Sequence, residues 1–181
     1  MGKIVIISGP SGSGKTTICN LLEKDPRVKK SVSVTTRPPR CNEKNGESYY
    51  FVLPAEFEEM IRKGELAEYA EYCGHFYGTP RKALREAISK EIFYLLEIEV
   101  QGALQIMEKF PEAMSIFLLP PDKKTLGHRL IQRNTNEEQD MALRLEIADK
   151  ELEYKDKYNY CVVNDNLEAT INTIRKILNL V

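Results

Sequence analysis

Two glycines, a lysine and a threonine near the start of the chain have the spacing of a phosphate-binding loop (P-loop). Gly9, Gly14, Lys15 and Thr16 match G-x-x-x-x-G-K-[ST] without a gap. Glycines let backbone N–H groups curl around a polyphosphate without Cβ clashes, and the following helix adds the positive end of its dipole. Lys15 would contact the outer phosphates, and the Thr16 hydroxyl would ligate magnesium. The predicted triphosphate-binding residues are Gly9, Pro10, Ser11, Gly12, Ser13, Gly14, Lys15, Thr16 and Thr17.

A second charged segment follows an alternating stretch, 29–36, that predicts a short extended segment. Pro38 and Pro39 separate Arg37 from Arg40 and restrict the backbone, so both guanidinium groups have little freedom. Each planar group can donate to two oxygens of a phosphate monoester, and two positive charges offset the dianion. Taken alone, this segment also fits a solvated basic turn.

Two acidic residues end a nearly continuous apolar run of strand length. Residues 92–98 are apolar on both faces, which is typical of a central parallel strand covered by helices. Glu97 and Glu99 therefore lie at the carboxyl edge of the sheet, on the same side as the P-loop, where a magnesium-bound phosphate would sit. The alternative is a pair of solvated acids at the end of a strand.

A long charged segment from Asp122 to Lys157 predicts two helices. Arg129 and Arg133 lie four residues apart on one face of the first helix, and Arg144 is on the second. Two amphipathic helices joined by a polar loop are typical of a lid whose arginines meet a triphosphate on closing. The alternative is a salt-bridged, solvent-exposed helix pair.

These side chains need a scaffold of alternating strands and helices. An apolar run leads into the P-loop and a helix-compatible run follows it, over 16–24. The next segment is mostly β, and strand–helix repeats complete the chain. This order predicts an α/β fold with a parallel sheet core flanked by helices, a mostly β insert and a helical lid. The other predicted strands are 49–52, a pair over 66–77, 114–119 and 160–164, and the other predicted helices are 54–63, 80–90, 101–109 and 167–180.

The composition is that of an ordinary globular domain, with 181 residues, 42% hydrophobic and 29% charged. A formal net charge of −1 provides no basic field, so we expect no nucleic-acid partner. Four scattered cysteines without a C-x-x-C pair disfavour a zinc site and favour a reducing compartment. No run approaches the ~18 apolar residues that cross a bilayer, and the N-terminal strand leaves no room for a signal peptide. We therefore expect a cytoplasmic protein without membrane contact.

Several blocks of the chain resemble the guanylate kinase family, and the similarity covers essentially the whole length. The P-loop is common to many kinases, whereas the second and fourth blocks below are specific to this family. The resemblance implies a P-loop NTPase-type fold and ATP-dependent phosphorylation of GMP, and of dGMP, to GDP, with ADP as co-product and Mg²⁺ as cofactor. The matching blocks are 8–15, 33–40, 45–49, 74–79 and 163–165.

The same resemblance implies a role for individual residues. The acceptor phosphate would be held by Arg37, Arg40, Tyr49 and Tyr77, and the base would be read by Ser33, Glu68 and Thr79. Guanine presents N1–H and its 2-amino group side by side as donors, and one carboxylate can accept both, whereas adenine has no such pair. Asn164 would lie near the ATP purine and ribose. The residues assigned to catalysis are Lys15, Arg37, Arg40, Arg129, Arg133 and Arg144.

Two positions depart from the family's pattern. Glu97 and Glu99 replace two common aspartates, which keeps the charge and lengthens each reach by a methylene; we assign Glu97 to magnesium and Glu99 to GMP. Asn134 replaces a frequent lid glycine, which would change the hinge rather than the chemistry. We expect one domain over 1–181, as monomer or homodimer. Its parts would be a core (about 1–32, 81–121 and 158–181), a GMP-binding insert (about 33–80) and a lid (about 122–157).

Three other functions remain open. A P-loop kinase for another phosphorylated acceptor, such as a ribose bisphosphate, is disfavoured because a sugar phosphate has no base for Glu68 to read. Guanylate-kinase-like domains of membrane-associated scaffolds bind phosphopeptides without turnover, but they usually have degraded P-loops, and here the loop is intact. A regulatory nucleotide sensor is also compatible, although no residue specifically indicates one.

Overall fold

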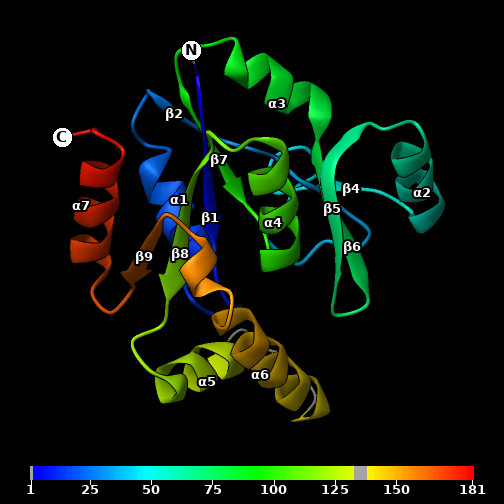
Figure 1. Ribbon diagram of the computed structural model, residues 1–181. Helices are drawn as coiled ribbons and strands as arrows, with labels where there is room; N and C mark the ends of the chain where they lie inside the picture. Colours follow the sequence, from blue (N-terminus) through cyan, green and yellow to red (C-terminus); the bar gives the residue numbers. More distant parts are fainter. Residues whose placement is uncertain (1, 133–137) are drawn as a thin grey trace.

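The structure is a computed structural model that describes residues 2–132 and 138–181, with side chains described outside 130–144. Strands and helices alternate as the sequence predicts (Figure 1). The elements are β1 (Lys3–Ser8), α1 (Lys15–Leu22), β2 (Val28–Lys30), β3 (Val34–Thr35), β4 (Tyr50–Phe51), α2 (Pro54–Arg62), β5 (Leu66–Tyr72), β6 (His75–Pro80), α3 (Arg81–Ile88), β7 (Phe93–Glu97), α4 (Val100–Lys109), β8 (Met114–Leu119), α5 (Lys123–Gln132), α6 (Glu138–Leu152), β9 (Tyr160–Val163) and α7 (Leu167–Ile177).

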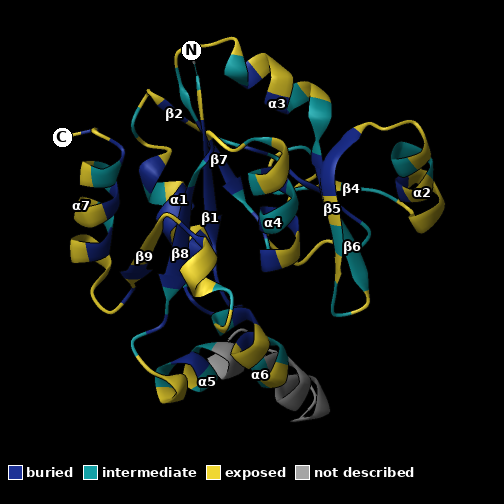
Figure 2. Cartoon of the chain, viewed as in Figure 1, coloured by how far each residue is buried: buried dark blue, intermediate teal, exposed yellow. Residues whose placement is uncertain are grey.

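The core is a five-stranded sheet in the order β2-β7-β1-β8-β9, and every neighbouring pair in it is parallel. Helices α1 and α7 pack on one face of this sheet, and α3 and α4 pack on the other. Because successive side chains of a strand alternate between faces, Ile4 and Ile6 join one core and Val5 and Ile7 join the other. The predicted parallel core flanked by helices is thus confirmed, and its three central strands, β7, β1 and β8, are buried on both faces (Figure 2).

A second sheet, in the order β4-β3-β6-β5, lies beside the core (Figure 1). The β5–β6 and β3–β6 pairs are antiparallel, and β3 pairs with β4 in parallel. Phe57 of α2 covers this sheet and packs with Val34 and Leu66. The prediction of a single extended segment over 29–36 is therefore wrong, because β2 belongs to the core sheet and β3 belongs to the second sheet.

Helices α5 and α6 lie beyond the carboxyl ends of β1 and β8, at the bottom of Figure 1. Leu126 of α5 packs against Ala148 and Leu145 of α6. In the described part of the chain, no helix is both long and apolar enough to span a bilayer.

Removal of the Phe117 ring is expected to destabilise the core. Phe117 is fully buried on β8, and its ring centroid lies 4.9 Å from that of Tyr158 in an edge-on contact. We expect Phe117→Ala to lower the free energy of unfolding by about 3–5 kcal/mol and the melting temperature by about 6 °C or more. Denaturant unfolding measures this, with the half-exposed Val163→Ala as control; a loss below about 1 kcal/mol would contradict the assigned packing.

Candidate active site

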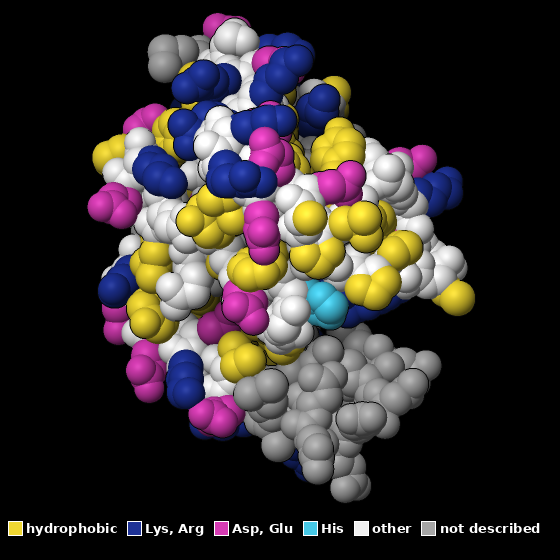
Figure 3. Space-filling view, turned by 90° about the vertical axis from the view of Figure 1, so that its right-hand side faces the viewer, with side chains coloured by type: hydrophobic (Ala, Val, Ile, Leu, Met, Phe, Trp, Pro, Cys, Tyr) yellow, Lys and Arg dark blue, Asp and Glu magenta, His cyan; other side chains and the backbone are white. Residues whose placement is uncertain are grey.

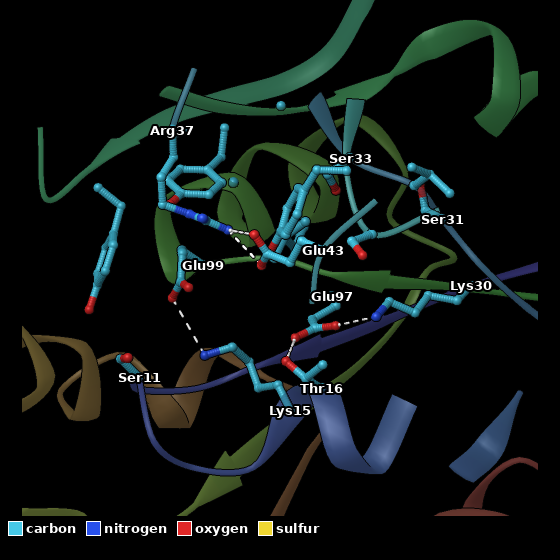
Figure 4. A pocket seen from close by; sticks show the side chains of 18 of the residues that line it. Ser11, Lys15, Thr16, Lys30, Ser31, Ser33, Arg37, Glu43, Glu97 and Glu99 are labelled. Atoms are coloured by element: carbon cyan, nitrogen blue, oxygen red, sulfur yellow. Dashed lines mark hydrogen bonds and ion pairs between the residues drawn. The ribbon is translucent and has the colours of Figure 1, made fainter. Parts of the chain in front are cut away.

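A polar cavity of about 840 Å³ opens where the P-loop and the end of β7 face the second sheet (Figure 4). Most of the residues that the sequence assigns to the site line this cavity. They come from the turn before α1, the first turn of α1, the carboxyl end of β7, and the segments around β3 to β6. The predicted residues that line it are Ser11, Gly12, Gly14, Lys15, Thr16, Thr17, Ser33, Arg37, Arg40, Tyr49, Glu68, Tyr77, Glu97 and Glu99.

Two glycines of the P-loop are required both by their backbone angles and by the lack of room for a Cβ atom. Gly9 and Gly14 have φ angles of 138° and 98°, which side-chain-bearing residues rarely adopt. A Cβ at Gly9 would lie 2.3 Å from the Leu118 carbonyl oxygen, and one at Gly14 would lie 2.3 Å from Asn164 Nδ2. The loop therefore follows the end of β8 closely, and its shape is fixed by its neighbours.

Lys15 folds back over the loop that precedes it. Its Nζ donates to the carbonyl oxygens of Gly9 at 2.5 Å and Pro10 at 3.2 Å, and lies 3.6 Å from Glu99 Oε2. The residue is only 7% exposed, so its charge is aimed along the loop toward the cavity and not into bulk solvent.

Thr16 and Glu97, the two residues assigned to magnesium, are in contact in the lining of the cavity. The Thr16 hydroxyl donates to Glu97 Oε1, and Lys30 Nζ lies 2.8 Å from Glu97 Oε2. Burial lowers the pKa of Lys30, but the Glu97 carboxylate raises it by more. The pKa of Lys30 is therefore above its ordinary value. Sequence reasoning missed Lys30. In the parallel pairing of β2 with β7, Lys30 lies opposite Leu95, which is two residues before Glu97 on the same strand.

Arg37 is held by an acidic residue that sequence reasoning also missed. Arg37 Nη2 donates to both oxygens of Glu43 at 2.8 and 2.9 Å, and the guanidinium lies 5.6 Å from the Tyr49 ring centroid. Partial burial raises the pKa of Glu43, but the hydrogen bond from Arg37 lowers it by more. The pKa of Glu43 is therefore below its ordinary value. Arg40 is exposed, and its backbone N–H donates to Glu43. A phosphate entering here would compete with Glu43 for Arg37.

Glu68 is a buried carboxyl group in the wall of the cavity. It is 3% exposed, and its Oε1 accepts a hydrogen bond of 2.6 Å from the Thr79 hydroxyl. Burial raises the pKa of Glu68 to about 7. Thr79 is fully buried behind Glu68, so its hydroxyl is committed to the carboxylate. Ser33 is 8% exposed and lines the cavity.

Glu151 brings a second buried carboxyl group toward Glu99 from the end of α6. Burial, and then the nearby Glu99 carboxylate, raise the pKa of Glu151 above its ordinary value. This residue gave no sequence signal, because it lies in a charged helical stretch where one more glutamate is unremarkable. It joins α6 to the part of the site that contains Lys15.

Asn164 fastens the P-loop from the end of β9. Its side-chain Nδ2 donates to the Ser13 carbonyl oxygen at 2.8 Å, and its backbone carbonyl oxygen accepts from Arg129 Nη2 at 3.1 Å. A second cavity of about 440 Å³ adjoins the loop here and is lined by Gly12, Gly14, Thr17, Arg129, Asn164, Asp165 and Leu167. Arg133 and Asn134 lie outside the described residues, and the side chain of Arg144 lies outside them as well.

Charged side chains of both signs are interspersed over the face drawn in Figure 3, so this face has no uniform basic field. The cavity itself is lined by basic side chains that could meet phosphates and by acidic side chains that neighbour them: Lys15, Lys30, Arg37 and Arg40, with Glu23, Glu43, Glu47, Glu68, Glu97 and Glu99.

Comparison with known proteins identifies the family of the chain. The guanylate kinase family model matches residues 1–180. A guanylate kinase of Desulfitobacterium hafniense is 45% identical over 98% of this chain and 89% of its own length, and one of Nostoc sp. is 46% identical over the same shares. The crystal structure of guanylate kinase from Anaplasma phagocytophilum has a TM-score of 0.83 at 37% identity, covering 99% of this chain and 85% of that one. A shikimate kinase from Bacteroides thetaiotaomicron, at 16% identity and a TM-score of 0.56, shares the fold alone. The chain belongs to the guanylate kinase family.

Proposed function

We propose that this protein transfers the γ-phosphoryl group of ATP to the phosphate of GMP or dGMP, giving ADP and GDP or dGDP, and so serves purine nucleotide metabolism. The observation that carries the proposal is that one cavity joins a complete P-loop to a buried carboxylate: Lys15 and Glu68 both line it. Family membership supports the same reaction.

The donor half of the site is the P-loop with the second cavity beside it. Backbone N–H groups of the loop and Lys15 hold the outer phosphates, and the start of α1 adds a favourable dipole. The cavity beside Asn164 and Arg129 accepts the purine and ribose. Arg129, Arg133 and Arg144 stabilise charge that develops on the transferred group.

The acceptor half combines cations and a base-reading carboxylate. Arg37 and Arg40, with Tyr49 and Tyr77, hold the phosphate of GMP. Glu68, with Ser33 and Glu99, lies against guanine, and Thr79 acts on the base through its bond to Glu68. The attacking phosphate oxygen is already anionic, so the reaction needs positioning and charge stabilisation but no general base.

Thr16 and Glu97 fit a magnesium ion, because a hydroxyl and a carboxylate oxygen in contact are hard oxygen donors. The described residues contain no cluster of three or more His, Cys, Asp or Glu able to hold a metal, so phosphate oxygens and water would complete the coordination. When bound with ATP, magnesium offsets charge on the outer phosphates. Lys30 neutralises Glu97 and keeps its carboxylate near Thr16.

Turnover of a panel of acceptors tests this proposal. Purified protein with Mg-ATP is expected to form ADP rapidly with GMP and dGMP, and slowly with AMP and UMP. Preferential turnover of a ribose bisphosphate would favour the sugar-phosphate kinase alternative. Absence of ATP binding in calorimetry would favour the phosphopeptide-binding alternative. We further propose that the protein is cytoplasmic and acts as a monomer or homodimer; sedimentation velocity measures the oligomeric state.

The affinity for GMP is expected to fall in mild acid. Guanine donors require the carboxylate form of Glu68, and burial raises the pKa of this group to about 7. Well below pH 7 the protonated acid dominates, so kcat/KM for GMP is expected to fall about tenfold per pH unit. The phosphate of GMP titrates near pH ~6 with every variant, so the profile of Glu68→Gln is the control. A wild-type profile no steeper than that of Glu68→Gln would contradict the assignment.

A further inference from the structure

Two side chains of α4 make three hydrogen bonds to the free edge of β5, the strand that carries Glu68. Gln105 Nε2 donates to the Tyr69 carbonyl at 2.7 Å, and Lys109 Nζ donates to the Ala67 carbonyl at 2.7 Å. The Tyr69 N–H donates to Gln105 Oε1 at 3.4 Å. β5 is an edge strand, so these side chains supply partners that a further strand would otherwise provide. They hold the backbone on both sides of Glu68.

Gly102 lies on the same face of α4, three residues before Gln105 and seven before Lys109. A Cβ at this position would lie 2.3 Å from Glu68 Oε2 and 2.9 Å from its Cδ. Glycine inside a helix is unfavourable relative to alanine. Here the missing side chain leaves the space that the carboxylate occupies. Gly102 and Glu68 both line the main cavity.

We propose that this face of α4 positions the Glu68 carboxylate for base recognition, and that Gly102 is a specificity-determining position. The inference rests on the proposed phosphorylation of GMP. One oxygen of Glu68 is fixed by Thr79, and the other lies over Gly102, so the plane of the carboxylate is set from two sides. A guanine donor pair needs both oxygens in its own plane, and a carboxylate displaced by about 1 Å loses much of that recognition.

The substitution Gly102→Ala separates recognition from folding. The atoms in the way of the new methyl group belong to the end of the Glu68 side chain, so Glu68 can turn away while the helix backbone stays in place. We expect kcat/KM for GMP to fall about 100-fold, the preference for GMP over IMP to approach one, and KM for ATP to stay unchanged. IMP is the informative probe because it lacks the 2-amino donor.

A matched control and a rescue make the test specific. Gly127 is also helical, in α5, and a Cβ there meets no atom within 4 Å, so Gly127→Ala is expected to behave as wild type. Shortening the carboxyl side chain by one methylene makes room for the methyl group. Glu68→Asp combined with Gly102→Ala is therefore expected to recover about tenfold of the GMP turnover lost in Gly102→Ala alone. A purely structural role of Gly102 predicts no such recovery.

The possible outcomes are distinguishable. If wild-type protein does not phosphorylate GMP, the proposed function fails. If wild type is active and Gly102→Ala keeps its GMP/IMP preference, this inference is overturned. If Gly102→Ala does not fold, Gln105→Ala tests the inference instead. It removes both hydrogen bonds to the Tyr69 backbone without adding volume near Glu68. KM for GMP is then expected to rise about tenfold; an unchanged KM overturns the inference.

Discussion

Replacement of Lys15 by alanine is expected to lower kcat for GMP phosphorylation by about 10³-fold or more. The Lys15 ammonium is nearly buried and directed along the P-loop by the Gly9 and Pro10 carbonyls. Charge that spreads over the transferred phosphoryl group is stabilised most by cations already in place, because little reorganisation is then required during the reaction. Steady-state kinetics with saturating Mg-ATP and GMP measure the loss.

The matched control is Lys29→Ala, which removes an exposed lysine from β2. It changes the net charge equally and is expected to leave kcat within about twofold of wild type. A Lys15→Ala enzyme that retained more than a tenth of wild-type kcat would mean that Lys15 holds the loop but does not act on the phosphates.

Replacement of Glu68 by glutamine is expected to lower kcat/KM for GMP by about 10³- to 10⁴-fold. The amide is isosteric, but its N–H₂ faces a guanine donor and leaves a buried polar group without a partner. Activity with IMP should fall much less, since IMP presents one donor only. Initial rates with both acceptors measure the change in preference.

Loss of stability is not expected to account for the lower kcat/KM of Glu68→Gln with GMP. Burial raises the pKa of Glu68 to about 7, above that of an unfolded glutamate, so ionisation at pH 8 favours the unfolded chain. Glu68→Gln is therefore expected to unfold no earlier than wild type at that pH. Glu71→Gln, at an exposed position of the same strand, is the control and should leave the GMP/IMP preference intact. Equal losses with GMP and IMP in Glu68→Gln would contradict base reading.

Features that depend on residues adjacent in the chain could be predicted from the amino-acid sequence. The P-loop needs only a few consecutive residues. The limits of β8, Met114–Leu119, were predicted as observed, because a short apolar run bounded by turn residues is typical of a buried strand. The α/β order of elements followed in the same way. From these features and the family resemblance, residues assigned to both halves of the site could be named in advance.

The charges and spaces that surround these residues became known from the folded chain alone. Lys30 reaches Glu97 through the pairing of β2 with β7, Glu43 faces Arg37 across a turn, and Glu151 arrives from α6. Thr79 stands behind Glu68 and not in the cavity, because the β5–β6 register places the two opposite one another. Gly102 is an ordinary helix residue in the sequence, and its role follows from the approach of Glu68 to within 2.3 Å of its absent Cβ. These contacts join segments distant in the chain, so no local pattern encodes them, and their energies depend on burial that exists only after folding.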